Sequence, residues 1–78
     1  MRKITWIIGI DKIAGNTVSD GILHYNKPVQ IFLDGQYLQE STQWTHDENA
    51  TDTTGSLNFG LIGGLLATQK LDIYLCIQ

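Results

Sequence analysis

Apolar and polar residues alternate with a period of two through much of this sequence of 78 residues, and such alternation favours β-strands that bury one face. No run of ten or more residues shows a good helical period, and the eight glycines disfavour helices. We therefore expect an all-β chain with at most one short helical turn, within residues 61–68. The expected inward-facing residues are Ile4, Trp6, Ile8 and Ile10 near the start, and Leu71, Ile73, Leu75 and Ile77 near the end.

A hairpin is predicted around the dipeptide Asp34-Gly35. Both residue types tolerate the positive φ angles that a two-residue type I′ turn requires. The flanking segments alternate as strands do, and their pairing would place Tyr37 opposite Phe32 or its neighbours. The inward-facing residues expected in the first arm are Val29, Ile31 and Leu33.

The remaining segments add further short strands and one loop. Residues 17–25 are typical of a strand interrupted by an Asp-Gly pair, and residues 56–60 are typical of a second strand. Residues 45–55 are polar and rich in turn formers, so we expect a loop that is mobile or faces a partner. About six or seven strands in this length predict one domain, residues 1–78, folded as a small antiparallel β-sandwich or barrel. Met1 favours a whole gene product.

The segment PVQIFLDG, residues 28–35, is followed after a gap by ATDTTGSLNFGLI, residues 50–62, and then by the last alternating segment. This succession resembles the small immunoglobulin-like, transthyretin-like β-sandwich domains over roughly the second two-thirds of the chain. The resemblance implies an immunoglobulin-like accessory or binding module that is not catalytic. The N-terminal Gly-x-Val strand usual in those domains is not obvious here, which leaves the pairing of the first strand open. The matching positions are Thr51, Asp52, Gly55, Leu57 and Phe59.

The charge of the chain argues against nucleic acid and anionic membranes as partners. The formal net charge is −3, and the five basic residues form no cluster beyond Arg2-Lys3. The apolar runs 4–10 and 59–67 fall short of the roughly 20 residues that span a bilayer, and no clean signal-peptide cleavage site follows the first run. The one cysteine, Cys76, has no partner for a disulfide within the chain, and we expect a virion or cytoplasmic protein.

The densest polar cluster lacks the spacing of a cation-binding loop. Asp52 stands where an EF-hand loop needs glycine, and Asn58 stands where that loop needs its bidentate glutamate. No pair of His or Cys residues has the spacing of zinc ligands, and neither Cys76 nor any serine lies in a catalytic sequence context. We therefore expect no metal, no cofactor and no enzymatic activity. The cluster comprises His46, Asp47, Glu48, Asn49 and Asp52.

Residues 59–67 carry no polar side chain, which is unusual for a connection between strands. Phe59, alone or with Leu61, is expected in a strand and in the core, whereas the glycines that follow break regular pairing. The rest of the run then forms a connection that either plugs an open end of the sandwich or docks on a neighbouring molecule. The small core and the low charge favour docking. The residues left in this connection are Ile62, Leu65 and Leu66.

Trp44 has two interpretations. It ends the polar segment QESTQW just before the loop, where an exposed indole would suit an interface anchor. Alternatively, it caps one end of the core. Together with the acidic side chains of the loop and the apolar connection, the candidate interface residues are Trp44, Ile62, Leu65, Leu66, Asp47, Glu48 and Asp52.

These features predict a structural or binding module that acts through protein contacts in a larger assembly or a homo-oligomer. The concrete form we expect is a virion accessory subunit of the capsid cement or decoration type. One alternative is a small phage-type inhibitor or adaptor, whose acidic loop 47–52 would face a basic surface of a host protein. Another alternative is a carbohydrate-binding module that uses Trp44 and the tyrosines on one sheet face, in which case the partner is a glycan.

Overall fold

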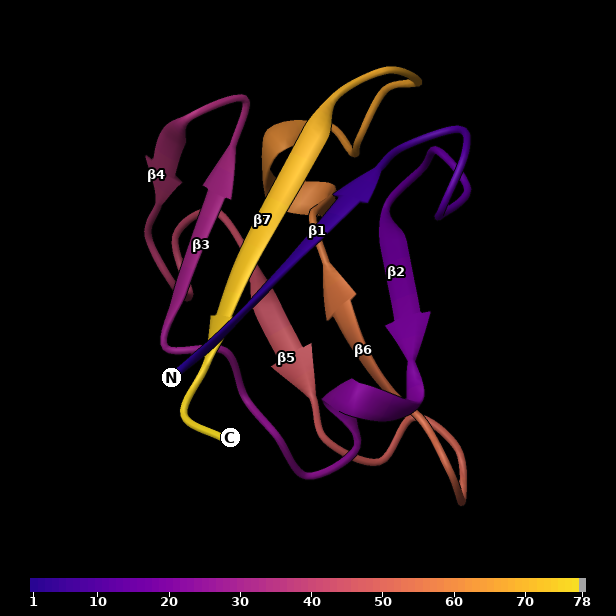
Figure 1. Ribbon diagram of the computed structural model, residues 1–78. Coiled ribbons are helices and arrows are strands. Elements are labelled where there is room, and N and C mark those ends of the chain that lie inside the picture. The colour runs from indigo at the N-terminus through magenta and orange to yellow at the C-terminus, as the bar shows by residue number, and fades with distance from the viewer. Residues whose placement is uncertain (78) are drawn as a thin grey trace.

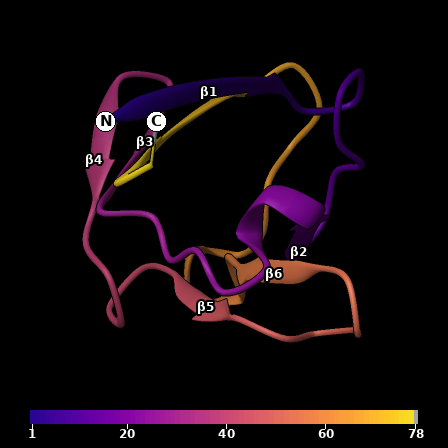
Figure 2. The same ribbon diagram turned by 60° about the horizontal axis from the view of Figure 1, so that its bottom comes forward.

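The computed structural model describes residues 1–77 and contains two antiparallel β-sheets (Figure 1). The first sheet has four strands in the order β1 (Arg2–Ile7), β7 (Lys70–Leu75), β3 (Gln30–Leu33) and β4 (Gln36–Leu38). The second has three strands in the order β2 (Thr17–Asp20), β6 (Gly55–Asn58) and β5 (Thr45–Asp47). Two single turns of 3₁₀ helix, η1 (Gly21–Leu23) and η2 (Gly60–Ile62), complete the elements. The sheets lie face to face in two layers, so the predicted small β-sandwich is confirmed (Figure 2).

The strand order differs from that of an immunoglobulin sandwich. Immunoglobulin constant-type domains place their first, second, fourth and fifth strands in one sheet. Here the first, third, fourth and seventh strands share a sheet. The first strand pairs with the last one, from Arg2 opposite Leu75 to Ile7 opposite Lys70, and β2 crosses to the other sheet. The resemblance therefore extends to the architecture of two packed sheets and not to their strand order.

The core lies between the sheets and is built from inward-facing residues of both. Alternation explains the central strand β7, where Leu71, Ile73 and Leu75 are fully buried. Leu57 in β6 and Phe59 just after it face them from the second sheet, as their spacing predicts. The buried apolar residues are Trp6, Ile8, Val18, Leu23, Ile31, Leu38, Trp44, Leu57, Phe59, Leu65, Leu71, Ile73 and Leu75.

The hairpin between β3 and β4 forms as predicted. Asp34 and Gly35 have φ angles of 50° and 84°, so both central residues occupy the left-handed region that a type I′ turn needs. Phe32 pairs with Tyr37 in the ladder. The Asp34 carboxylate also accepts a hydrogen bond of 2.8 Å from the backbone N–H of Lys70, which joins the turn to the start of β7.

Three expectations about strand faces are wrong. Ile10 is 81% exposed because β1 ends at Ile7, and a turn follows in which the Ile10 N–H donates to the Ile7 carbonyl. Val29 is 46% exposed because it precedes β3, which begins at Gln30, and the buried residue at this point of the chain is Pro28. Leu61 is 60% exposed because the chain turns into η2 directly after Phe59.

The predicted loop 45–55 also needs correction. Its first three residues form β5, which pairs with β6 so that His46 lies opposite Leu57. The remaining polar residues, 48–54, form the connection from β5 to β6. The loop is therefore shorter than the composition of the segment indicates.

Candidate protein interface at one end of the sandwich

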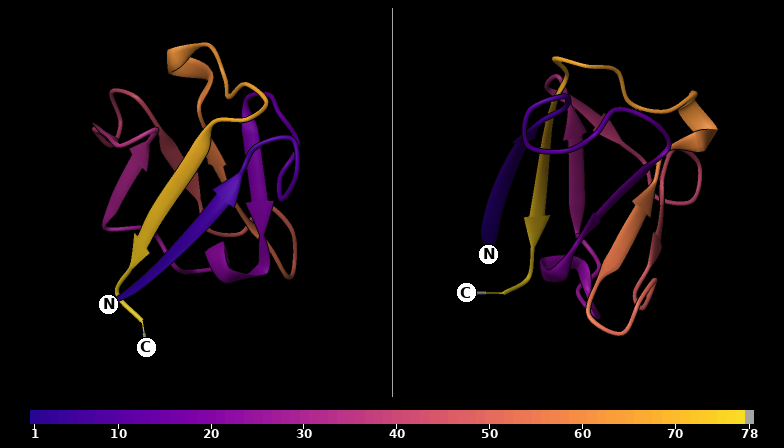
Figure 3. Two further views of the ribbon diagram at one scale, coloured as in Figure 1. Left: turned by 45° about the horizontal axis from the view of Figure 1, so that its top comes forward. Right: turned by 90° about the vertical axis from the view of Figure 1, so that its right-hand side faces the viewer.

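Two connections meet at the end of the sandwich that lies away from the chain termini (Figure 1, Figure 3). One links β1 to β2 and the other links η2 to β7. Gly15 and Leu65 exchange backbone hydrogen bonds of 2.9 and 2.8 Å, and the Thr68 N–H donates to the Ile8 carbonyl at 2.7 Å. The two connections therefore brace each other along their length.

Glycine is required where these connections come closest. Gly64 has a φ angle of +86°, and a Cβ atom there would lie 2.6 Å from Oδ1 of Asn16 and 3.1 Å from the backbone of Gly15. Any larger residue would have both an unfavourable backbone conformation and a steric clash. Gly64 thus allows the close contact that holds the second connection against the first.

Four aliphatic side chains are left exposed on these two connections and on η2, and we call this set the apolar end. Their exposed fractions are 81% for Ile10, 85% for Ile13, 60% for Leu61 and 67% for Leu66. They make up half of the eight large hydrophobic residues that are strongly exposed in the described chain. Exposed apolar side chains gathered in one region mark interaction sites more often than scattered ones do.

The segment that carries Ile10 and Ile13 is held by a dense set of hydrogen bonds. The Gly9 N–H donates to the Lys12 carbonyl at 2.6 Å, and the Ile7 N–H donates to the Asp11 carboxylate at 2.8 Å. An open groove of about 440 Å³ lies between this segment and the start of β2. The two isoleucines thus line a groove, on a segment whose backbone is held by hydrogen bonds.

Lys12 ties the same segment to β2. Its ammonium group donates hydrogen bonds of 2.7 Å to the Ser19 carbonyl and to the Asp20 carboxylate, and it lies 4.7 Å from the centre of the Trp6 ring. Burial acts to raise the pKa of the Asp20 carboxyl, but the hydrogen bonds from Lys12 and from the Ile22 N–H, with the charge of Lys12, outweigh it. The pKa of Asp20 therefore lies below its ordinary value.

The sequence leaves open whether the apolar connection plugs the end of the core or docks on another molecule, and in the structure its residues divide between a buried and an exposed position. Leu65 is 2% exposed and plugs the end of the core, and Ile62 is half-buried against the core. Leu66, which follows directly, points to solvent. Of the three predicted docking residues, only Leu66 is fully available to a partner.

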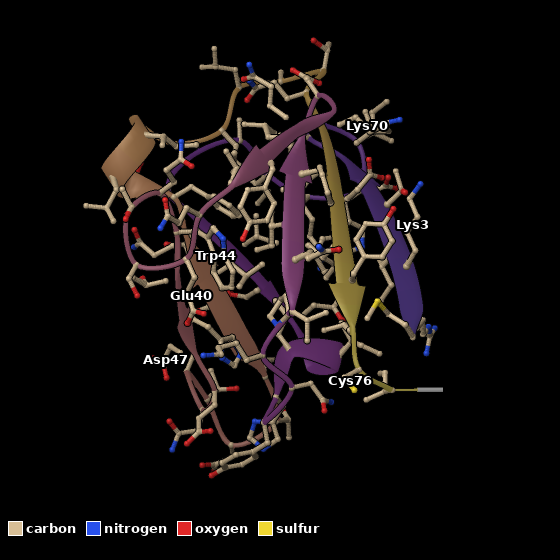
Figure 4. All side chains as sticks on the ribbon, turned by 90° about the vertical axis from the view of Figure 1, so that its left-hand side faces the viewer. Lys3, Glu40, Trp44, Asp47, Lys70 and Cys76 are labelled. Atoms are coloured by element: carbon tan, nitrogen blue, oxygen red, sulfur yellow. The ribbon has the colours of Figure 1, made fainter. Side chains whose placement is uncertain are left out.

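Trp44 caps the core and is not a surface anchor. It is 2% exposed, and its indole N–H donates a hydrogen bond of 3.0 Å to the Leu38 carbonyl. A tight turn after β4 brings it inward, because the Gln43 N–H bonds to the Gln39 carbonyl and the Ser41 N–H bonds to the Trp44 carbonyl. Figure 4 shows Trp44 between the two sheets.

The acidic candidates lie at the other end of the sandwich. Asp47 and Glu48 border a shallow pocket of about 560 Å³ beside the ion pair of Lys27 and Glu40, whose charged atoms are 2.7 Å apart (Figure 4). Asp52 is exposed in the connection that follows β5. The structure therefore does not bring the acidic residues together with the apolar end.

Both histidines of the chain are engaged in holding backbone groups. His46 Nε2 donates to the Leu23 carbonyl at 2.8 Å, and His24 Nδ1 lies 3.3 Å from the Thr54 carbonyl. These contacts fasten η1 to the β5–β6 region. They give each imidazole a structural role in the fold.

Sequence reasoning missed Ile10, Ile13 and Leu61 as candidate interface residues. The alternation predicts Ile10 on the inward face of a strand, and Leu61 is predicted with Phe59 in the core. The available signal was the pair of glycines, Gly9 and Gly15, that encloses the two isoleucines, together with the charged pair Asp11-Lys12 between them. Glycines mark turns and loops, and the charged pair interrupts the apolar alternation of a strand.

Within residues 1–77, no helix is long and apolar enough to cross a membrane. In comparisons with protein-family models, curated proteins and solved structures, nothing matches this chain.

Proposed function

We propose that this chain is a non-catalytic binding module that docks on another protein through the apolar end. The observation that supports this proposal is the exposure of four aliphatic side chains, each by 60% or more, on η2 and on two connections that brace each other. An ordered apolar surface loses little conformational entropy when it binds, because its backbone is already in place.

The size of the apolar end suits one part of a larger interface. Four aliphatic side chains would bury several hundred Å², which gives on the order of 5 kcal/mol of gross hydrophobic stabilisation at about 25 cal/mol per Å². Association costs a comparable amount in lost translational and rotational freedom. We therefore propose a subunit of a multi-chain assembly, of the capsid cement or decoration type that the sequence predicts, in which further contacts add to this one.

Site-specific photocrosslinking tests this proposal. A photoreactive residue such as benzoylphenylalanine would replace Ile13 or Leu66 in the full chain, and crosslinking would be done in the cells or particles from which the sequence comes. We expect both positions to crosslink to the same partner, either a second protein or another copy of the chain. The matched control places the photoreactive residue at Tyr25, which is 61% exposed and whose backbone N–H donates to the Glu48 carbonyl, beside the acidic candidates and away from the apolar end.

The outcomes separate the proposal from its alternative. Two results together would support docking through the apolar end. Positions 13 and 66 should crosslink to the partner, and an Ile13→Ser, Leu66→Ser double variant should bind that partner more weakly. Crosslinks confined to position 25, or a monomer with none, would overturn it. The inhibitor or adaptor alternative depends on the exposed acidic residues Asp47 and Glu48. It predicts crosslinks from position 48 and an affinity that falls steeply with salt.

A further inference from the structure

The outer face of the four-stranded sheet combines aromatic and charged residues in two rows that run across the strands. Within residues 1–77, no other element lies over this face (Figure 2). One row crosses all four strands and the other crosses three. The first row is Tyr37, Phe32, Asp72 and Thr5, and the second is Gln30, Tyr74 and Lys3.

Three aromatic rings form the apolar part of this face. The Phe32 ring lies edge-to-face with both Tyr37 and Tyr74, with ring centres 5.7 Å apart in each pair. Tyr37, on the edge strand β4, is 54% exposed. The contacts hold the three rings in fixed relative orientations, so the face is organised before any ligand arrives.

A buried carboxylate lies beside the rings. The alternation of β7 places Asp72 on the outer face as predicted, yet its side chain is only 8% exposed. One of its oxygens accepts a hydrogen bond from the Thr5 hydroxyl. Burying a carboxylate is unfavourable unless its oxygens are satisfied, so the second oxygen is an acceptor suited to a ligand's hydroxyl group.

Two lysines flank this carboxylate without forming a hydrogen bond to it. The ammonium groups of Lys3 and Lys70 are 4.0 and 3.8 Å from the Asp72 oxygens, beyond hydrogen-bond distance, and both side chains are half-exposed. Lys3 also lies 5.9 Å from the centre of the Tyr74 ring. Figure 4 shows both lysines projecting on the same side of the sheet. The face thus presents a carboxylate acceptor and two ammonium groups that make no hydrogen bond within residues 1–77, next to the aromatic rings.

We propose that this face of the four-stranded sheet is a saccharide-binding site. A pyranose ring has one side made of C–H groups, which packs on an aromatic ring, and a rim of hydroxyl groups that donate to a carboxylate and accept from ammonium groups. Tyr37 and Phe32 would pack against the C–H side of the sugar. Asp72, Lys3 and Lys70 would hydrogen-bond to its hydroxyl groups. The site is separate from the apolar end, and it does not depend on the proposed function.

The charges of the face narrow the class of saccharide. Two ammonium groups face one carboxylate, so a sugar that carries a carboxylate or sulfate group gains an attraction that a neutral sugar lacks. A nucleic acid would also stack on the rings, but its phosphates need a longer basic track than two lysines in a chain of net charge −3.

A glycan array followed by an NMR titration tests this inference on the full chain. The array should include neutral oligosaccharides and oligosaccharides bearing uronate, sialate or sulfate groups, and the best-bound member should then be titrated into ¹⁵N-labelled protein. We expect binding of acidic members, with amide shifts concentrated in β3, β4 and β7. The excess affinity of acidic over neutral members should fall as salt is added.

Two surface variants and one matched control complete the test. Tyr37→Ala should weaken binding about tenfold or more, as expected for the loss of one stacked ring, and Lys70→Gln should remove the preference for acidic sugars. Tyr25→Ala removes an equally exposed tyrosine elsewhere and should leave the affinity unchanged. Binding to no array member, shifts that map to other strands, or equal weakening by the two tyrosine variants would overturn the inference.

Discussion

At the scale of single residues, close approaches of the backbone determine which side chains this fold accepts. A Cβ atom at Gly55 would lie 2.1 Å from the carbonyl oxygen of Leu23. That carbonyl cannot easily move away, because it accepts the hydrogen bond from His46. Gly55 starts β6 at the point where η1 packs against the second sheet, so a hydrogen atom is the only side chain that fits.

Gly55→Ala should therefore lower the free energy of unfolding by about 3 kcal/mol or more, since η1 or β6 must shift to relieve the clash. Urea denaturation would measure this change. The matched control is Gly21→Ala, where the added Cβ would make an ordinary contact of 3.6 Å with the Thr53 carbonyl. The control should change the free energy of unfolding by less than about 1 kcal/mol. Equal effects of the two substitutions would show that the close approach at Gly55 is not what limits the site.

At the scale of elements, the connection from β1 to β2 is stabilised by one ion pair. Lys12 and Asp20 are 2.7 Å apart, with the charged side chains only 18% and 34% exposed. The Asp20 carboxylate also accepts a hydrogen bond from the Ile22 N–H, and so caps η1. A single carboxylate thus links the loop that carries two residues of the apolar end to a strand and to a 3₁₀ turn.

The lowered pKa of Asp20 predicts a pH dependence of stability. In the unfolded chain this carboxyl takes up its proton near the ordinary value of 3.8, whereas the folded carboxyl takes it up at a lower pH. The stabilisation is therefore complete above that value and is lost as the pH falls through the folded pKa. Urea denaturation at about pH 6 and about pH 3 should show this loss, and Asp20→Asn should reduce it.

Lys12→Gln provides a second way to test the same ion pair. Removing the ammonium group should also reduce the loss of stability at low pH, because Asp20 then lacks the partner that favours its charged form. If both variants keep the full acid sensitivity of the parent chain, the sensitivity arises from other carboxylates and the role given to Asp20 is wrong.

At the scale of the whole molecule, each sheet has a strand that pairs with neighbours on both sides and joins segments distant in the sequence. β7 lies between β1 and β3, and β6 lies between β2 and β5. Strands β1 and β7 come from the two ends of the chain, so the four-stranded sheet cannot close until nearly all residues are in place. The edge strands β4 and β5, of three residues each, have neighbours on one side only.

This arrangement predicts an order of amide hydrogen exchange. Amides of β7 and β6 should exchange most slowly, because releasing them requires unfolding of the sheets on both sides. Amides of β4 and β5 should exchange faster through local opening at the edges. NMR-detected exchange at individual amides would measure both groups. Protection in β5 equal to that in β7 would contradict the prediction and would indicate that the two sheets open only together.

The candidate surfaces show where sequence reasoning succeeds and where it fails. The hairpin at Asp34-Gly35 and the inward face of β7 follow from local rules, because turn chemistry and strand alternation depend on neighbouring residues. The burial of Trp44 depends on a turn after β4 that brings the indole to the Leu38 carbonyl. The exposure of Ile10 depends on where β1 stops, which its pairing with β7 decides.

Short antiparallel strands follow from local features of the sequence alone, because the period of two and the glycine-containing turns act over a few residues. Which strands share a sheet depends on contacts between distant segments, since the pairing of β1 with β7 joins residues more than sixty positions apart. That choice also decided which apolar side chains are left outside, and which polar one, Asp72, is enclosed on the outer face. Alternation predicts the buried face within a strand, as in β7, but where each strand ends and what covers it depend on the packing of the whole chain.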